Sequence, residues 1–173
     1  IFDYKVDLKS NTILLNDGID DDTLLLVQSG LLLMRNKPVT ILLNSGGGDV
    51  SSGLGICDAI REHGKVTIKV YGKAESMAAV ILQTARRRLI SQSSHLMIHQ
   101  GVEEPAPDSK KNIKSYLKLS DTKDDICDRI VLKQIQKKHP KYSWTDFRNA
   151  THFDVYFTAE DALKWGLVDG VIK

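Results

Sequence analysis

The chain has 173 residues, of which 42% are hydrophobic and 27% are charged, so it is long enough to bury a core of its own as one domain. Its 24 basic and 22 acidic residues leave a net charge of +2, too small for a dedicated nucleic-acid binder or a polybasic membrane binder. The chain has two cysteines, too few for a disulfide framework, and no CxxC pair that would suggest a zinc site. Its apolar runs are too short to span a membrane. These features favour a cytoplasmic protein.

The first part of the chain alternates between predicted strands and helices. Residues 13–15 form a short apolar strand that ends in an Asn-Asp-Gly turn, and acidic residues then begin a helix over about 20–35. Residues 39–43 are a continuous apolar run of the kind found inside a parallel sheet. A second helix is expected over about 51–63, with Gly64 ending it.

The middle of the chain predicts a strand, a turn and a short helix. Apolar residues alternate over 66–70, residues 71–75 are expected to form a turn, and a helix follows over about 76–85. The arginines at 86–88 are expected to complement the negative end of that helix, and an anion site is the alternative. Residues 96–98 predict the next strand.

The last third is dominated by one long charged helix, predicted over about 109–138 and ended by a His-Pro pair. A loop over 101–107, rich in Gly and Pro, precedes it. Shorter helices are expected over 143–149 and 158–166, and a terminal strand over 168–172. Repeated strand–helix–strand units indicate an α/β fold with parallel pairing.

Two strand-to-helix turns could bind a ligand, because such turns direct free backbone N–H groups at whatever lies above them. Gly46, Gly47 and Gly48 form the first, which is either a close approach to a ligand or merely a tight turn. In the second, Ser76 is either a helix N-cap or a nucleophile. A nucleophile needs an oxyanion hole, and the N–H of Met77 with one from Gly47 or Gly48 would supply it.

His99 is the candidate general base, because it ends an apolar strand that would deliver its side chain into a cleft; a structural role is the alternative. Asp154 is the candidate orienting carboxylate. It is a lone acid in an aromatic stretch, so its burial would require His99 or a structural arginine as partner. His95 shares a strand face with His99, but no carboxylate completes a metal site. Cys57 and Cys127 are expected to be free thiols.

Taken in order, several segments resemble the motifs of the ClpP-like serine peptidases. They are Asn44-Ser-Gly-Gly-Gly48, Gly72-x-x-x-Ser-Met-Ala-Ala79, Leu96-Met-Ile-His-Gln100, Asp154 before Tyr-Phe-Thr-Ala-Glu-Asp-Ala162, and Trp165-Gly-Leu-Val-Asp169. The resemblance runs over about 7–172. It implies an α/β spiral of repeated strand–strand–helix units, shared by ClpP and crotonase-like folds. A long helix over about 109–138 would protrude from a single domain covering residues 1–173.

The resemblance implies a serine endopeptidase that hydrolyses peptide bonds through an acyl-enzyme. It makes Ser76 the nucleophile, His99 the general base and Asp154 the residue that orients His99. Backbone N–H groups of Gly48 and Met77 become the oxyanion hole, and no metal or organic cofactor is required. The family pattern also implies a homo-oligomeric heptameric ring, with a second ring stacked on it, that degrades peptides or unfolded proteins. The small net charge and the short apolar runs predict neither a nucleic-acid nor a membrane partner.

Several departures from the family pattern bear on these implications. Only about six residues precede the first strand, where the family has a flexible segment that meets an unfoldase, so a Clp-type ATPase partner is left open. Acids and prolines over 101–108 replace a glycine-rich stretch, which leaves ring stacking open. Glu75 stands where a small residue is usual, and would either favour basic substrates or disfavour catalysis. Gly46 stands where proline is usual. A divergent phage- or prophage-type member fits these departures.

Two other functions are alternatives to an active peptidase. The chain is either a catalytically idle structural subunit of a ring, or it performs acyl-CoA chemistry on a crotonase-like fold. The acyl-CoA reading needs no Ser/His pair, so the effect of replacing Ser76 separates it from peptidase chemistry.

Overall fold

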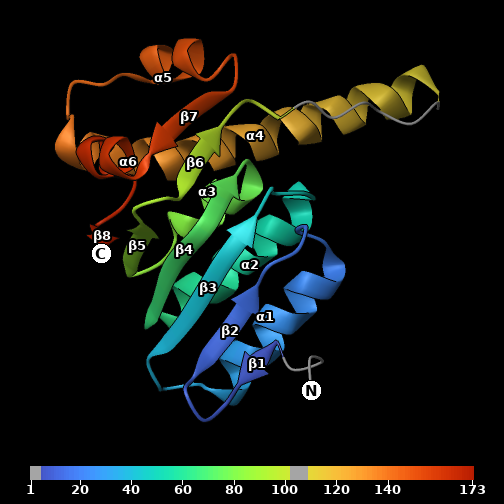
Figure 1. Ribbon diagram of the computed structural model, residues 1–173. Coiled ribbons are helices and arrows are strands. Elements are labelled where there is room, and N and C mark those ends of the chain that lie inside the picture. The colour runs from blue at the N-terminus through green and yellow to red at the C-terminus, as the bar shows by residue number, and fades with distance from the viewer. Residues whose placement is uncertain (1–4, 102–108) are drawn as a thin grey trace.

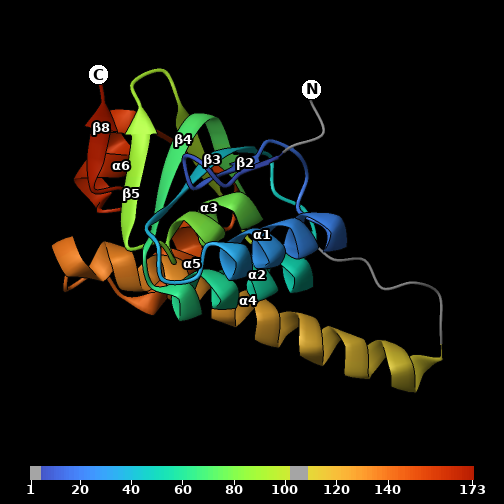
Figure 2. The same ribbon diagram turned by 90° about the horizontal axis from the view of Figure 1, so that it is seen from below.

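The computed structural model describes residues 5–101 and 109–173, in which one sheet is covered by helices on one side (Figures 1 and 2). The strands are β1 (Val6–Asp7), β2 (Thr12–Leu15), β3 (Val39–Ser45), β4 (Val66–Glu75), β5 (Arg87–Ser91), β6 (His95–Ile98), β7 (Val155–Thr158) and β8 (Gly170–Ile172). The helices are α1 (Asp21–Leu33), α2 (Val50–His63), α3 (Met77–Leu82), α4 (Lys110–Lys138), α5 (Trp144–Ala150) and α6 (Ala159–Trp165). This mixed architecture confirms the predicted α/β class.

The sheet runs in the order β1-β2-β3-β4-β5-β8, and β4 organises it. The first part of β4, residues 67–70, pairs in parallel with β5, and its last part, residues 73–75, pairs in parallel with β6. β7 then pairs antiparallel with β6. Because β4 and β6 are parallel neighbours with Glu75 opposite Met97, the residues that follow the two strands emerge at the same edge.

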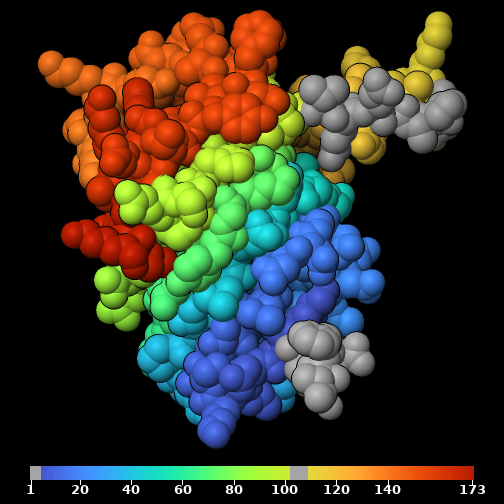
Figure 3. Space-filling model, in the orientation of Figure 1, coloured from blue at the N-terminus to red at the C-terminus, as the bar shows by residue number. Residues whose placement is uncertain are grey.

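The core lies between the sheet and helices α1 to α4. Along β3 the burial alternates: Val39, Ile41 and Leu43 are fully buried, whereas Thr40 and Leu42 are only half-buried. The continuous apolar run is therefore covered on one face only, and Figure 3 shows the other face with no helix in front of β3 and β4. The uncovered face is mixed in character, because it carries Thr40 and Leu42 of β3 and Thr67 and Lys69 of β4.

Apart from the end of α3, the predicted helix ends agree closely with the structure because local capping determines them. Asp20 caps α1 and accepts from Thr23 N, Gly64 ends α2 in the left-handed conformation, and Thr158 caps α6. The long helix α4 extends well beyond the body of the molecule (Figures 1 and 2). Its buried residues lie between Ser120 and Ile135, while exposed apolar side chains mark its outer half.

The expected turn over 71–75 is wrong, because β4 continues through it to Glu75. The register with β3 shifts between Leu43 and Ser45, and Gly72 adopts a φ of +100° at this irregularity. Asn44 Oδ1 accepts from Lys73 N at 3.2 Å, and Ser94 Oγ accepts from Gly72 N at 2.7 Å. Side chains from neighbouring segments thus accept hydrogen bonds from the backbone N–H groups of Gly72 and Lys73, which lie at the irregularity of the strand. The glycine that had suggested a turn instead marks this irregularity.

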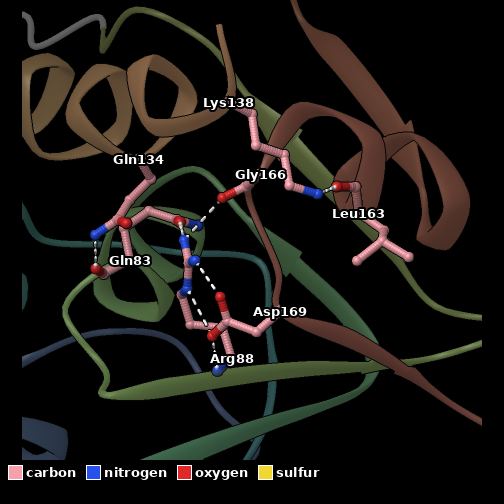
Figure 4. A network of polar contacts seen from close by, with 7 residues as sticks. All are labelled: Gln83, Arg88, Gln134, Lys138, Leu163, Gly166 and Asp169. Carbon is pink, nitrogen blue, oxygen red and sulfur yellow. Dashed lines mark hydrogen bonds and ion pairs between the residues drawn. The ribbon is translucent and has the colours of Figure 1, made fainter. Parts of the chain in front are cut away.

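The expected role for residues 86–88 is also wrong, because α3 ends at Leu82 and Arg87 and Arg88 lie in β5. The buried Arg88 forms a bidentate ion pair with Asp169, and its Nη1 donates to Gln83 Oε1 and Gly166 O, each at 2.9 Å (Figure 4). We call this set the Arg88 clamp. Burial alone would raise the pKa of Asp169, but hydrogen bonds from Arg88 outweigh it and hold that pKa below its ordinary value.

Among the described residues, no helix is long and apolar enough to cross a membrane.

Candidate active site

Ser76 lies between β4 and α3 with a φ of +53°, a conformation that costs energy for a residue with a side chain. Its backbone N–H donates to Met97 O at 2.9 Å, which ties the turn to β6. Although Ser76 occupies the N-cap position of α3, its hydroxyl makes no capping hydrogen bond. The hydroxyl is instead 2.9 Å from Nε2 of His99.

His99 follows β6 by one residue and links Ser76 to Asp154. Its Nε2 faces the Ser76 hydroxyl, and its Nδ1 lies 3.2 Å from Asp154 Oδ1. Asp154 directly precedes β7, whose Val155 pairs with Ile98, so the antiparallel register sets the carboxylate opposite the imidazole. Three residues that are far apart in the sequence are thus brought into one chain of polar contacts by strands β4, β6 and β7.

Asp154 is not buried as its aromatic neighbours had suggested. Its side chain is 53% exposed, and Phe153 beside it is 75% exposed. Successive side chains of β7 point to opposite faces of the sheet, and those of one face, including Tyr156, are exposed to solvent. The partner named from the sequence, His99, is present, whereas the argument from burial was wrong.

The glycine turn after β3 packs directly against Ser76. A Cβ on Gly47, whose φ is +92°, would lie 2.8 Å from Ser76 Cβ and 3.0 Å from Met77 N. A Cβ on Gly48, whose φ is +149°, would lie 2.3 Å from Ile19 O. Only glycine fits such close approaches. The turn is therefore both tight and in contact with the serine.

The two expected oxyanion donors lie in this region. Met77 begins α3, and the N–H groups of a first helical turn have no acceptor within the helix. The Gly48 segment is held by a bridge to Ile19 that uses the N–H groups of Ile19 and Asp49, and the N–H of Gly48 is not part of that bridge. Met77 thus begins α3, and Gly48 lies just before the N-cap of α2 in a segment that is held by the backbone of Ile19.

Glu75 is engaged by two cationic or basic side chains that sequence reasoning missed. Its carboxylate accepts from Lys73 Nζ at 2.7 Å and lies 2.9 Å from His95 Nε2. The hydrogen bond from Lys73, followed by that from His95, lowers the pKa of Glu75. Lys73 and Glu75 share a face of β4 by alternation, which the sequence contains, but the pairing of Lys73 with His95 depends on the register of β4 and β6.

Neither thiol lies in this chain of contacts. Cys57 and Cys127 are free, as predicted, and burial raises the pKa of each thiol to about 12. Across 5–101 and 109–173, no group of three His, Cys, Asp or Glu side chains could hold a metal ion. The expected loop over 101–107 lies outside the described residues except for Gly101.

Comparison with protein families places the whole site within one match. The family model described as Clp protease matches residues 2–173. The matched range includes the glycine turn, Ser76, His99 and Asp154, and it extends over α4 and the last strand.

Proposed function

This chain belongs to the Clp protease family, and from that premise we propose that it is a serine endopeptidase formed by a single domain over residues 1–173. The observation that carries the proposal is the chain of contacts from Ser76 Oγ through His99 to Asp154, with distances of 2.9 Å and 3.2 Å. A hydroxyl, an imidazole and a carboxylate in this order form the constellation that activates a serine nucleophile.

In the proposed reaction, Ser76 Oγ attacks the carbonyl carbon of the scissile peptide bond while His99 Nε2 takes its proton. His99 then gives this proton to the leaving amine, and an acyl-enzyme remains on Ser76. Water attacks the ester in the same way, which releases the second product and restores the serine. Asp154 keeps the imidazole oriented and stabilises it while it is charged. No metal or organic cofactor enters this cycle.

Gly48 and Met77 are the proposed donors to the oxyanion. The close packing of Gly47 on Ser76 and Met77 supports this assignment, because it brings the glycine turn and the start of α3 to the nucleophile together. Each donor in such a hole typically contributes on the order of 10²–10³ to kcat. The unusual φ of Ser76 is consistent with a hydroxyl held for reaction rather than for capping.

We also propose that the chain works as a homo-oligomer, a heptameric ring that can stack on a second ring, and that its substrates are peptides or unfolded proteins. Support comes from apolar side chains with no cover within the described residues. On α1 these are Leu25, Leu32 and Leu33, each more than 60% exposed, and on the protruding part of α4 they include Leu119, 54% exposed. Exposed apolar patches commonly mark interaction surfaces.

A serine-directed fluorophosphonate probe tests the proposal. We expect intact-mass analysis to show one adduct on the wild type, none on Ser76→Ala, and one on Ser93→Ala, a control at an exposed serine of the β5–β6 connection. Hydrolysis of an unfolded protein should follow the same pattern. An assembled wild type that forms no adduct would support the idle-subunit alternative, and acyl-CoA turnover that survives Ser76→Ala would support the crotonase-like one.

A further inference from the structure

A groove of about 420 Å³ lies between α4 and the ends of α2 and α3, away from the candidate active site. Figure 2 shows α4 passing alongside these two helices. Four basic side chains line the groove, Arg61 from α2 and Arg129, Lys133 and Lys137 from α4. Within the part of the chain that the structure describes, no acidic side chain lines it. We call it the basic groove.

The charges of the basic groove are only partly matched. Arg61 is 3.2 Å from Asp58, an exposed pair, and the Arg129 guanidinium lies 4.6 Å from the ring centroid of Trp144. Neither Lys133 nor Lys137 forms an ion pair with any of residues 5–101 or 109–173. Lys137 is near enough to Asp169 to help lower the pKa of that carboxyl, so its charge is partly matched from outside the groove. The ammonium group of Lys133 is the least matched charge of the row.

Three of the basic side chains lie close together along α4, although Lys137, in the last turn, also complements the negative end of the helix dipole. Arg129, Lys133 and Lys137 follow one another at intervals of four residues, so they form one row of like charges. Like charges at this spacing repel each other and destabilise a helix. Anionic groups bound along the row would offset that repulsion, so binding of an anionic ligand to these side chains is favoured.

The spacing and the apolar wall indicate which kind of anion fits. Four helical residues span about 6 Å, close to the roughly 6.6 Å between alternate side chains of an extended peptide. Ile126, which is 42% exposed, and Ile130 line the same groove, and a purely inorganic polyanion gains nothing from them. A peptide that carries acidic and apolar side chains makes use of both features.

We propose that the basic groove binds an extended acidic peptide segment of a partner protein, with carboxylates on the row Arg129–Lys133–Lys137 and apolar side chains on Ile126 and Ile130. Recognition of acidic motifs by clusters of basic side chains is a recurrent mode of peptide binding. None of Ser76, His99 and Asp154 lines the groove, so the proposal is independent of peptidase activity.

Binding of a short fluorescein-labelled peptide of alternating Glu and Leu, followed by anisotropy on the assembled protein, tests this. The Ser76→Ala background prevents cleavage of the probe. We expect the double variant Lys133→Glu, Lys137→Glu to bind on the order of tenfold more weakly or worse, because two attractions become repulsions. Added salt should weaken binding to the background protein and have less effect on the double variant.

The matched control is Lys114→Glu, Lys118→Glu, which makes the same change of charge at the same spacing on the exposed outer part of α4. Unchanged affinity in this control supports the basic groove as the site. Equal loss in both variants, or no binding by the background protein, overturns the proposal. It is also overturned if inorganic polyphosphate binds and the peptide does not. A change in the assembly's sedimentation in the Lys133/Lys137 variant, with peptide affinity intact, would instead assign the groove to a second copy of this chain.

Discussion

The Ser76–His99–Asp154 contacts and the Arg88 clamp each set an aspartate against a nitrogen-bearing side chain, but their surroundings differ. The side chains of His99 and Asp154 are 31% and 53% exposed, whereas those of Arg88 and Asp169 are 7% and 38% exposed. Arg88 also donates hydrogen bonds to the side-chain oxygen of Gln83 and the backbone oxygen of Gly166, so its N–H groups are used within the fold. Solvent reaches the first group, and the second joins β5 to the segment before β8. Solvent access separates the two sites, and so does residue type, because an imidazole can take up and release a proton whereas a guanidinium stays charged.

The largest effect is expected at Asp154, because an orienting carboxylate acts on chemistry and not on folding. We expect Asp154→Asn to lower kcat by on the order of 10⁴, since the amide cannot stabilise a charged imidazole. Peptide hydrolysis measures this effect. The free energy of unfolding, measured by urea titration, should change by no more than about 0.5 kcal/mol, as for an ordinary surface substitution. A variant that retains full activity would contradict the proposed role.

A smaller effect, on stability, is expected at the clamp. We expect Arg88→Met to lower the free energy of unfolding by about 3 kcal/mol, the low end for breaking a buried ion pair, because Asp169 is partly exposed and water replaces some contacts. Urea unfolding measures the change.

The neighbouring Arg87, which is exposed in β5, supplies the matched control. Arg87→Met should change the free energy of unfolding by less than about 0.5 kcal/mol. If Arg88→Met lowers the activity per folded molecule as strongly as Asp154→Asn does, the contrast between the two sites fails. Replacing both partners, with Asp169→Leu added to Arg88→Met, should recover part of the loss.

The smallest effect is the acid sensitivity of the clamp. The pKa of Asp169 is lower in the folded protein than its ordinary value of 3.8. Asp169 therefore stabilises the fold above about pH 4, and this contribution is lost as the pH falls through the lower, folded pKa. We expect the free energy of unfolding of Asp169→Asn to fall less steeply below pH 4 than that of the wild type. Parallel slopes in urea titrations would show that Asp169 does not carry this acid dependence.

Several helix ends and the first part of β4 could be predicted from the sequence, because they depend on interactions between residues close together in the chain. Asp20, Gly64 and Thr158 mark helix ends through bonds or backbone conformations that involve only near neighbours. The apolar alternation of 66–70 likewise predicts the first part of β4. By contrast, β7 and the last part of β4 contain exposed or polar residues, and they are strands because β6 lies between them.

The candidate site was likewise predictable in part: its residues could be named, but the contacts around them could not. Ser76, His99 and Asp154 could be named because each stands at a strand end within a motif that resembles the Clp protease family. Lys73 and His95 could not be assigned to Glu75, because that contact requires Lys73 to lie opposite His95 across two strands. Nor could Arg88 be recognised as a buried partner of Asp169, since a row of arginines after a helix has a simpler local explanation.

The sequence by itself determined the α/β class, the helix ends other than that of α3, the glycine turn and the identities of the candidate site residues, because these depend on neighbours along the chain or on motifs of fixed spacing. Only the tertiary structure decided the length of β4, the pairing of Arg88 with Asp169, the exposure of Asp154 and the charge lining of the basic groove. Each of these depends on which distant segment lies alongside, and on whether water can reach the space between them.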